Sequence, residues 1–422
     1  MLGEPIHPPI RLLYRFLLTI TMAASFLPAV RASDDTAAQV VRLRQEVEFA
    51  YTAYQNGSQG SDNWATYVRI DQEDVPKILD LLRGNKSFDG LSTIAWIVLE
   101  NRLDQGATGM PTLKGLHSRV IELLLDRYSE DPGVGRICWY IGMHWWPAGN
   151  RAAADLFDAV GKRNKDPAAR ACAIYAAAYF LKVRAASIEF TESLPDDVRF
   201  TGPNVQDYRV QFEEAEAAGG SSHLNAQAAE KFRAVIVQYG SFPMGGADTG
   251  TCGQAAQEAL DEIEHFCVGV RAPDITGTDL RGQPLHTSDF RGKIVVLSFW
   301  GSWCGPCMAM VPIERRLAER LAGKAVALVG VNSDLEIARG LAAAVGEQMT
   351  WPSFWNGPLG SKGPISKEWH VVGWPSVFVL DSEGIIRFKS TGFGLESERE
   401  IKGVVDHLLN HPYAVRNHSV SL

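Results

Sequence analysis

The chain has 422 residues and a formal net charge of −8, with 46% apolar and 21% charged residues. This length accommodates two or three domains, and the composition is ordinary for a globular protein. The net negative charge argues against binding to nucleic acid and against binding to an anionic membrane surface, because both kinds of binding require basic patches. The composition therefore predicts a multidomain globular protein.

The first 32 residues have the features of a signal peptide. Arg11 and Arg15 precede an apolar run over 16–27, and Val-Arg-Ala at 30–32 offers a cleavage site. The apolar run is short for a membrane span. We expect export with cleavage, which would place the mature chain in an oxidising compartment such as a periplasm. An uncleaved signal that anchors the chain in a membrane and a cytosolic protein with an apolar leader are the alternatives.

Residues 33–268 have the pattern of helices joined by short polar turns. Apolar residues recur at helical spacing, for example over 40–54 and 168–183, with almost no alternation of period two. We expect an all-α domain, either a TPR- or HEAT-like array or an irregular bundle. No fixed repeat length is evident, although 225–239 is similar to a TPR helix. The stretch 187–222 is expected to form a long connection.

From 269 to 411, short apolar strands alternate with helical patterns, which predicts a mixed α/β domain. Lys293–Trp300 is rich in β-branched and aromatic residues and is expected to be a central, buried strand. Segments 377–380 and 385–391 are expected to pair as a hairpin. The last residues, 412–422, are expected to be a loose tail.

Two cysteines separated by two residues lie where the central strand would pass into a helix. Cys304 and Cys307 enclose Gly305 and Pro306, and Trp303 precedes them. Unpaired N–H groups and the dipole at a helix N-terminus stabilise a thiolate, so the pKa of Cys304 should be low. Cys307, one turn later, can attack a mixed disulfide formed at Cys304. Pro306 suits the first helical turn because its missing N–H costs no hydrogen bond there.

A structural zinc half-site is the alternative interpretation of this spacing. No second C-x-x-C occurs, so we expect a redox-active disulfide with no metal and no other cofactor. Cys138 and Cys172 lie in apolar helical sequence and are expected to be buried free thiols. Cys252 and Cys267 bracket one expected helix, which would hold them about 20 Å apart. Other pairings among these four cysteines stay open.

At these residues the chain resembles the thioredoxin superfamily. The Trp-Cys-Gly-Pro-Cys motif ending at Cys307 is one signature, and Gly373-Trp374-Pro375 before an apolar strand is the second. The resemblance implies that Pro375 is a cis-proline beside the disulfide and that the backbone at Trp374 pairs with an extended substrate segment. Trp303, Gly373, Trp374 and Pro375 are therefore expected to shape substrate contact. A packed loop aromatic is the alternative interpretation of Trp374.

The segment 272–293 is similar to the opening of TlpA-like, AhpC/TSA-related thiol-disulfide oxidoreductases, and the resemblance spans about 269–411. The resemblance implies a proton-relay acid at one of two positions. Thioredoxins carry an Asp at the position of Ser298, and several TlpA-like reductases carry a Glu at the position of Met310, but neither residue is acidic here. Glu314 is the nearest acid on the expected motif helix. We expect it to lie on the solvated surface of that helix.

The sequence thus predicts an exported thiol-disulfide oxidoreductase that acts on protein thiols and disulfides and on an upstream electron donor or acceptor. A thiol peroxidase is one rival, but it would need Thr or Ser three residues before its cysteine, where Gly301 stands. A helical binding module with a vestigial or regulatory redox pair is the other rival. By analogy with related proteins, Trp351, Phe354 and Trp355 are expected to shape a docking surface.

Overall fold

The computed structural model describes residues 35–56, 73, 75–84, 90–99, 111–144, 151–195, 205–244, 250–392 and 397–411. The expected signal peptide and the expected C-terminal tail lie outside these residues. The described residues divide into two compact units, one up to Arg170 and the other from Ala171 onward. Each unit is described by itself.

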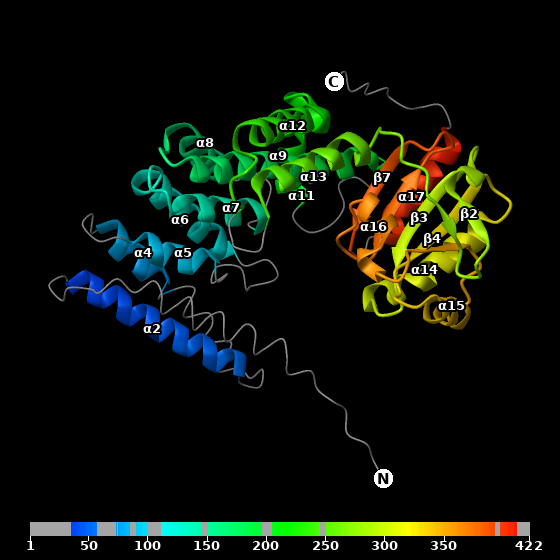
Figure 1. Ribbon diagram of the computed structural model, residues 1–422, viewed down its shortest axis with the longest axis horizontal. Helices are drawn as coiled ribbons and strands as arrows, with labels where there is room; N and C mark the ends of the chain where they lie inside the picture. Colours follow the sequence, from blue (N-terminus) through cyan, green and yellow to red (C-terminus); the bar gives the residue numbers. More distant parts are fainter. Residues whose placement is uncertain are drawn as a thin grey trace, which may run out of the picture. The chain divides into compact units, whose positions relative to one another are not determined.

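The first unit is all-helical (Figure 1). Asn164 ties the end of one helix to the turn after another, since its side-chain amide donates to the carbonyls of Ser129 at 3.0 Å and Asp131 at 2.8 Å. The buried residues of the helix at 75–84, namely Val75, Ile78, Leu79 and Leu82, follow helical spacing. The helices are α2 (Asp35–Asn56), α4 (Val75–Gly84), α5 (Leu91–Leu99), α6 (Pro111–Arg127), α7 (Val134–His144), α8 (Arg151–Arg163) and the start of α9 (Pro167–Ser193).

Helices also open the second unit, where α9 continues and is followed by α11 (Val205–Ala217), α12 (Gly220–Tyr239) and α13 (Cys252–Phe266). The expectation of a long connection over 187–222 was wrong, because α9, α11 and α12 occupy most of it. Ile188 and Ala215 are buried together with Leu224, and such tertiary burial stabilises helices whose local sequence is ambiguous. Among the described residues, α9 is long and apolar enough to span a membrane, with 44% of its most apolar window buried.

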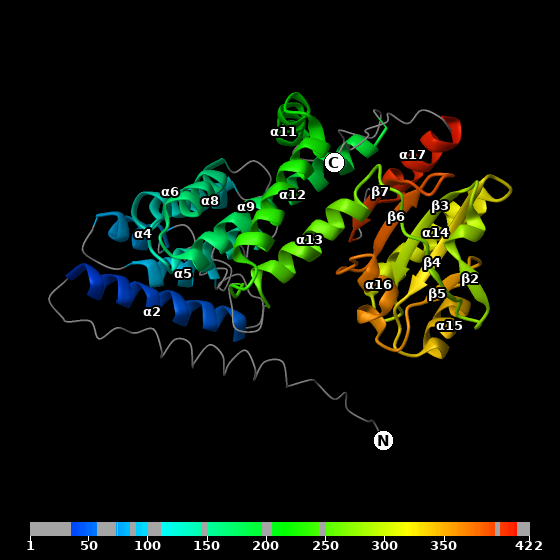
Figure 2. The same cartoon turned by 45° about the horizontal axis from the view of Figure 1, so that its top comes forward.

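A five-stranded mixed sheet forms the rest of the second unit, in the order β5-β4-β3-β6-β7 (Figure 2). The central strand β3 is buried along its whole length, as its apolar run predicts. It pairs in parallel with β4 and antiparallel with β6. The strands are β3 (Ile294–Trp300), β4 (Val326–Asn332), β5 (Ser353–Trp355), β6 (Ser376–Leu380) and β7 (Ile386–Thr391), preceded by a separate hairpin of β1 (Thr276–Thr278) and β2 (Pro284–His286).

Helices cover both faces of this sheet. On one face lie α14 (Gly305–Leu321) and α17 (Ser397–Asn410), where Val296 packs with Met310 and Val404. On the other face lie the end of α13, the β1-β2 hairpin and α16 (Pro364–Glu368), with Phe299 and Trp369 in the core. A further helix, α15 (Ile337–Gly346), follows β4. This is the α/β thioredoxin-like fold that the sequence predicts.

Two aromatic residues expected on a docking surface lie in the core instead. Trp351 is 8% exposed and Phe354 is fully buried. The reason is that β5 pairs with β4, so the segment adds a strand to the sheet and turns these side chains inward. Trp355 is half-buried, and its indole N–H donates to the carbonyl of Asp334 at 3.0 Å.

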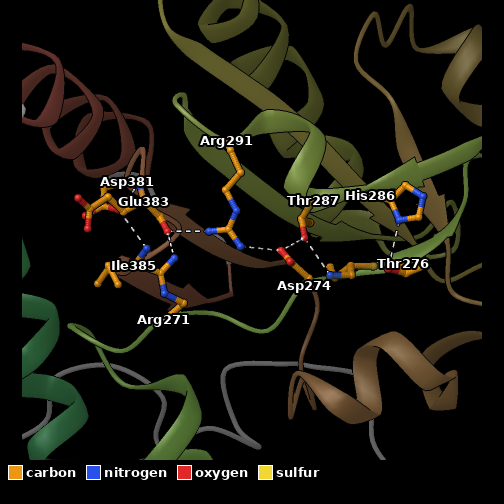
Figure 3. Close-up of polar contacts among 10 residues, drawn as sticks. Arg271, Asp274, Thr276, His286, Thr287, Arg291, Asp381, Glu383 and Ile385 are labelled. Carbon is orange, nitrogen blue, oxygen red and sulfur yellow. Dashed lines mark hydrogen bonds and ion pairs between the residues drawn. The ribbon is translucent and has the colours of Figure 1, made fainter.

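The segment that leads into the sheet is held by a cluster of polar contacts (Figure 3). Arg291 donates to the carboxylate of Asp274 at 3.0 Å and to the carbonyl of Glu383, in the turn between β6 and β7, at 2.7 Å. Arg271 donates to the same carbonyl. The hydroxyl of Thr287 donates to Asp274 at 3.2 Å. These bonds fix the β1-β2 hairpin against the far end of the sheet from the C-x-x-C motif.

Candidate active site

Cys304 is the N-cap residue of α14, at the point where β3 has ended and the helix begins. Its Sγ accepts a hydrogen bond from the backbone N–H of Cys307 at 3.1 Å. An N–H donor at a helix N-terminus favours the anionic form of a sulfur atom. Gly305 and Pro306 form the first turn, where the missing N–H of Pro306 leaves no bond unmade. The strand-to-helix junction expected from sequence is therefore present.

Cys304 and Cys307 are joined by a disulfide, with sulfur atoms 2.04 Å apart. Cys304 is 5% exposed and Cys307 1%, so a partner reaches Cys304 first. His407, in the last turn of α17, and His411, directly after the helix, have the H-x-x-x-H spacing of some zinc sites, and their rings stack with centroids 4.7 Å apart. The C-x-x-C sulfurs nevertheless bond to each other. The other four cysteines are buried and form no disulfide, namely Cys138, Cys172, Cys252 and Cys267.

Two tryptophans lie beside the disulfide. Trp303 is 46% exposed, and its indole N–H donates to the carbonyl of Ser333 at 3.1 Å. The ring centroids of Trp303 and Trp374 are 5.8 Å apart. Trp374 also packs against the buried cluster that contains both cysteines, and its peptide bond to Pro375 is cis. The structure thus brings together the residues that the resemblance pointed to.

The loop before β6 is closely packed at Gly373. A Cβ atom on this residue would lie 2.6 Å from Cγ2 of Thr391, so a side chain here would force the Thr391 side chain to move. The carbonyl of Gly373 accepts from the hydroxyl of Ser376 at 2.8 Å. The carbonyl of Pro375 accepts from the N–H of Gly392, also at 2.8 Å. These contacts hold the cis-proline loop in place beside the disulfide.

The carboxylate of Asp334, which the sequence analysis did not single out, holds the loop before Cys304. Asp334 is fully buried and accepts from the N–H of Ser302 at 3.0 Å and from its hydroxyl at 2.6 Å. The amide of Asn332 donates at 2.7 Å, and Arg339 forms an ion pair at 3.5 Å. The sequence could have indicated this role. Asn332 and Asp334 lie at the end of β4, and the ends of adjacent parallel strands meet at one edge of a sheet, so these residues lie beside the end of β3.

Glu314 is buried, so the expectation of a solvated position was wrong. It is 5% exposed and lies on the same buried side of α14 as Cys307 and Met310. A spacing of seven residues returns a side chain to the same helix face, and here that face meets the sheet. Burial raises the pKa of Glu314 to about 7, although the hydroxyl of Ser298, which faces it from β3, opposes the rise.

Comparison with known proteins assigns the C-terminal third of the chain. Residues 268–389 match the AhpC/TSA family. The thioredoxin-like protein YneN of Bacillus subtilis (strain 168) is 30% identical over 138 residues, which are 32% of this chain and 77% of that protein. The chain belongs to the AhpC/TSA family of thioredoxin-like proteins. Thiol-disulfide oxidoreductase ResA of Geobacillus kaustophilus (strain HTA426) is 31% identical over 128 residues, 30% of this chain and 70% of that protein.

Solved structures give similar partial matches. The thioredoxin domain of a thiol-disulfide oxidoreductase from Bacteroides vulgatus is 25% identical to this chain. The match covers 33% of this chain and 99% of that domain, with a TM-score of 0.30. StoA from Bacillus subtilis is 24% identical, and the match covers 31% of this chain and 96% of StoA, with a TM-score of 0.27. From its relatives in the family, this chain is a thiol-disulfide oxidoreductase in its C-terminal third. The family match leaves helices α2 to α13 outside.

Proposed function

We propose that the protein exchanges disulfides with protein partners through Cys304 and Cys307. The observation that carries the proposal is the position of Cys304 at the N-cap, with its sulfur bonded to Cys307 and accepting the N–H of that residue. In the reduced state, the Cys304 thiolate attacks a partner disulfide. The partner S–S bond breaks, one partner sulfur leaves as a thiolate, and a mixed disulfide forms.

The second step regenerates the internal disulfide. Cys307 loses its proton and attacks Sγ of Cys304, and the second partner sulfur leaves as a thiolate. Two electrons have then passed to the partner, and an upstream dithiol must reduce the Cys304–Cys307 disulfide before the next cycle. The same steps run backwards would oxidise a partner. The potential of the pair decides between a reductant near −270 mV, as in thioredoxin, and an oxidant near −120 mV, as in DsbA.

The partner surface proposed here surrounds the disulfide. Trp303 and Val372 are 46% and 93% exposed, and Val372 directly precedes the loop of Gly373, Trp374 and Pro375. Exposed apolar groups of this kind suit an extended segment that lies along the cis-proline loop. A client cysteine flanked by apolar residues fits this surface best.

An extracytoplasmic site of action is part of the proposal. It is supported by the basic and apolar run over 1–32 and by the redox chemistry, since stable disulfide exchange partners are abundant outside the cytoplasm. Cell fractionation of the full chain tests it. Replacing Arg11 and Arg15 by Glu should leave the protein in the cytoplasm with residues 1–32 attached, whereas an unchanged distribution contradicts export through this segment.

The exchange reaction is tested by trapping. Cys307→Ser should accumulate mixed disulfides with client proteins that dissolve in excess dithiothreitol, while Cys304→Ser, the matched control, should accumulate none. The wild type should reduce insulin with dithiothreitol as donor. If Cys307→Ser traps nothing and the wild type does not reduce insulin, the redox proposal fails and the helical binding module gains support. Consumption of hydrogen peroxide would instead indicate the peroxidase.

A further inference from the structure

One buried ionisable group on α14, the helix that begins at the disulfide, has no part in the steps above. We infer that Glu314 takes up the proton that Cys307 releases when it attacks the mixed disulfide, and that Glu314 exchanges this proton with solvent through a cavity beneath α14. The inference rests on the proposed function and assigns the proton path at the same site.

A cavity of about 230 Å³ lies beside the carboxyl group of Glu314, between α14, α17 and the sheet. Val296 and Val377 line it from the sheet, Met310 from α14 and Ile401 from α17. A water molecule occupies about 30 Å³ in the liquid, so the space admits several. Arg316, Arg320, Glu398 and Lys402 also line the cavity. Glu314 is the buried carboxyl group among the lining residues, so water inside the cavity would order around it.

The polar atoms at this place lack partners within the described part of the chain. Oε1 of Glu314 and the hydroxyl of Ser298 are buried and complete no hydrogen bond in this geometry, although the hydroxyl lies close enough to lower the pKa of the Glu314 carboxyl group. A buried polar group without a partner costs about 1–3 kcal/mol, so such a pair needs an explanation. Water in the cavity or a transferred proton would satisfy both groups.

Ser298 lies between Glu314 and the disulfide along β3. After β3 ends at Trp300, the chain reverses direction and forms α14, which packs on the face of the sheet that carries Val296 and Trp300. Trp300 belongs to the buried cluster that contains Cys304 and Cys307, while Val296 belongs to the next cluster, with Met310. Ser298 falls between these two levels. This position makes the Ser298 hydroxyl the candidate link between Cys307 and Glu314, with water completing the path.

The charged groups around the cavity pair with one another rather than with the buried carboxyl. Arg316 binds Glu398 at 2.7 Å, Arg320 binds Asp406 at 2.6 Å, and Lys402 binds Asp406 at 3.2 Å. The lining residues of β3 and β6 carry no charge. Without a counter-ion among the described residues, the buried carboxyl titrates near neutral pH, which suits it to accept and release protons there.

The proton balance of the step is then complete. Before it, Cys307 is a thiol and Glu314 a carboxylate. As the Cys307 sulfur attacks Cys304, its proton moves through Ser298 to the carboxylate, the partner sulfur leaves as a thiolate, and the Cys304–Cys307 bond forms. Glu314 afterwards releases the proton into the cavity and to solvent. In the reducing direction, the same carboxyl group returns a proton to the Cys307 thiolate.

The test uses the reduced full-length protein and glutathione disulfide as the oxidant, from pH 5 to 9. Glu314→Gln should slow the second step at least tenfold at pH 7 and should accumulate the Cys304–glutathione adduct, detected by intact mass. The wild-type rate should rise with a midpoint near pH 7, and this midpoint should be absent in the variant. Glu319→Gln, an exposed acid on the same helix, is the matched control and should match the wild type.

Two further variants separate proton transfer from structure. Glu314→Asp should restore a midpoint near neutral pH. Ser298→Ala should slow the second step, because the hydroxyl carries the proton, and should move the midpoint upward, since the hydroxyl favours the ionised carboxyl. If Glu314→Gln keeps the wild-type pH profile and accumulates no adduct, the inference is overturned while the exchange reaction stands. If neither the wild type nor any of the variants reacts with glutathione disulfide, the proposed function itself fails.

Discussion

The carboxyl group of Glu314 makes stability depend on pH. Burial raises its pKa from an ordinary value of 4.5 to about 7. Below pH 4.5 the group is protonated in the folded and the unfolded chain, so it costs nothing. As the pH rises to 7, the unfolded chain releases the proton first and stability falls. At about 1.4 kcal/mol per pKa unit, the loss above pH 7 is on the order of 3 kcal/mol.

Glu314→Gln should remove this dependence, because the amide is neutral at every pH. We expect the free energy of unfolding of the variant, relative to the wild type, to increase by about 2–3 kcal/mol between pH 4.5 and pH 8. Urea unfolding of the oxidised proteins measures it. Glu319→Gln should differ from the wild type by an amount that does not change with pH. A constant offset for Glu314→Gln as well would show that the carboxyl is not desolvated.

A single close contact sets the position of Trp303. A Cβ atom at Gly301 would lie 2.6 Å from Nε1 of the Trp303 indole. Gly301→Ala should therefore push the ring outward, break its hydrogen bond to the carbonyl of Ser333 and increase the quenching of Trp303 fluorescence by acrylamide. Gly305→Ala is the matched control, since a Cβ there meets no atom within 4 Å. Equal quenching in both variants would contradict this account.

At the scale of elements, the loop between β3 and α14 depends on the segment that follows β4. Asp334 binds both the N–H and the hydroxyl of Ser302. Asp334→Asn presents an amide N–H₂ group in place of one of these acceptor oxygens, so at least one donor loses its partner. A loss of about 1–1.5 kcal/mol in the alignment of this loop corresponds to roughly tenfold slower insulin reduction.

The matched control is Asp381→Asn, which removes a carboxylate that binds Arg387 in the turn between β6 and β7. It should lower stability without changing the accessibility of Trp303. Asp334→Asn should change both insulin reduction and acrylamide quenching. If both variants lose only stability, the carboxylate of Asp334 has no role in positioning the motif.

Prediction from sequence succeeded where one segment carries its own pattern. Three local patterns were sufficient to predict local structure without knowledge of distant contacts. They are the apolar run of β3, the cysteine spacing and the apolar strand after Pro375. Prediction failed where distant contacts decide. Trp351 and Phe354 are inside because β5 pairs with β4, and Glu314 is buried because its face of α14 packs on the sheet, where Ser298 of β3 faces it. Asp334 was not predicted because its bond to Ser302 depends on the pairing of β3 with β4.

At the scale of the second unit, the helices before the sheet share its core. The ring centroids of Phe190 in α9 and Phe388 in β7 are 5.4 Å apart. Leu194 is buried in the cluster that includes β3, β6 and α17. β7 is an edge strand, and exposed edges favour aggregation, so this cover protects the sheet. The boundary expected at 268/269 follows the change in sequence pattern and the family match, whereas buried contacts continue across it.

A partly buried ion-pair network crosses the boundary at 268/269. Nζ of Lys389 in β7 lies 3.7 Å from Glu189 in α9 and 3.7 Å from Glu262 in α13, and Lys182 binds Glu262 at 2.5 Å. Burial raises the pKa of Glu189, although Lys389 opposes the rise. Asn225 of α12 donates to Glu189 at 3.4 Å. The network therefore ties three helices to the sheet through one lysine.

Lys389→Met tests whether the helices and the sheet unfold together. Removing the ammonium group leaves the nearly buried carboxylate of Glu189 without its counter-ion, which should lower the free energy of unfolding by about 3–5 kcal/mol. Lys402→Met, which removes an exposed ion pair with Asp406, should cost no more than about 0.5 kcal/mol. Urea unfolding followed by helical circular dichroism and by tryptophan fluorescence should move to lower denaturant in both signals. A shift in fluorescence alone would mean that the sheet opens while α9, α12 and α13 stay folded, and that the sheet and these helices are independent.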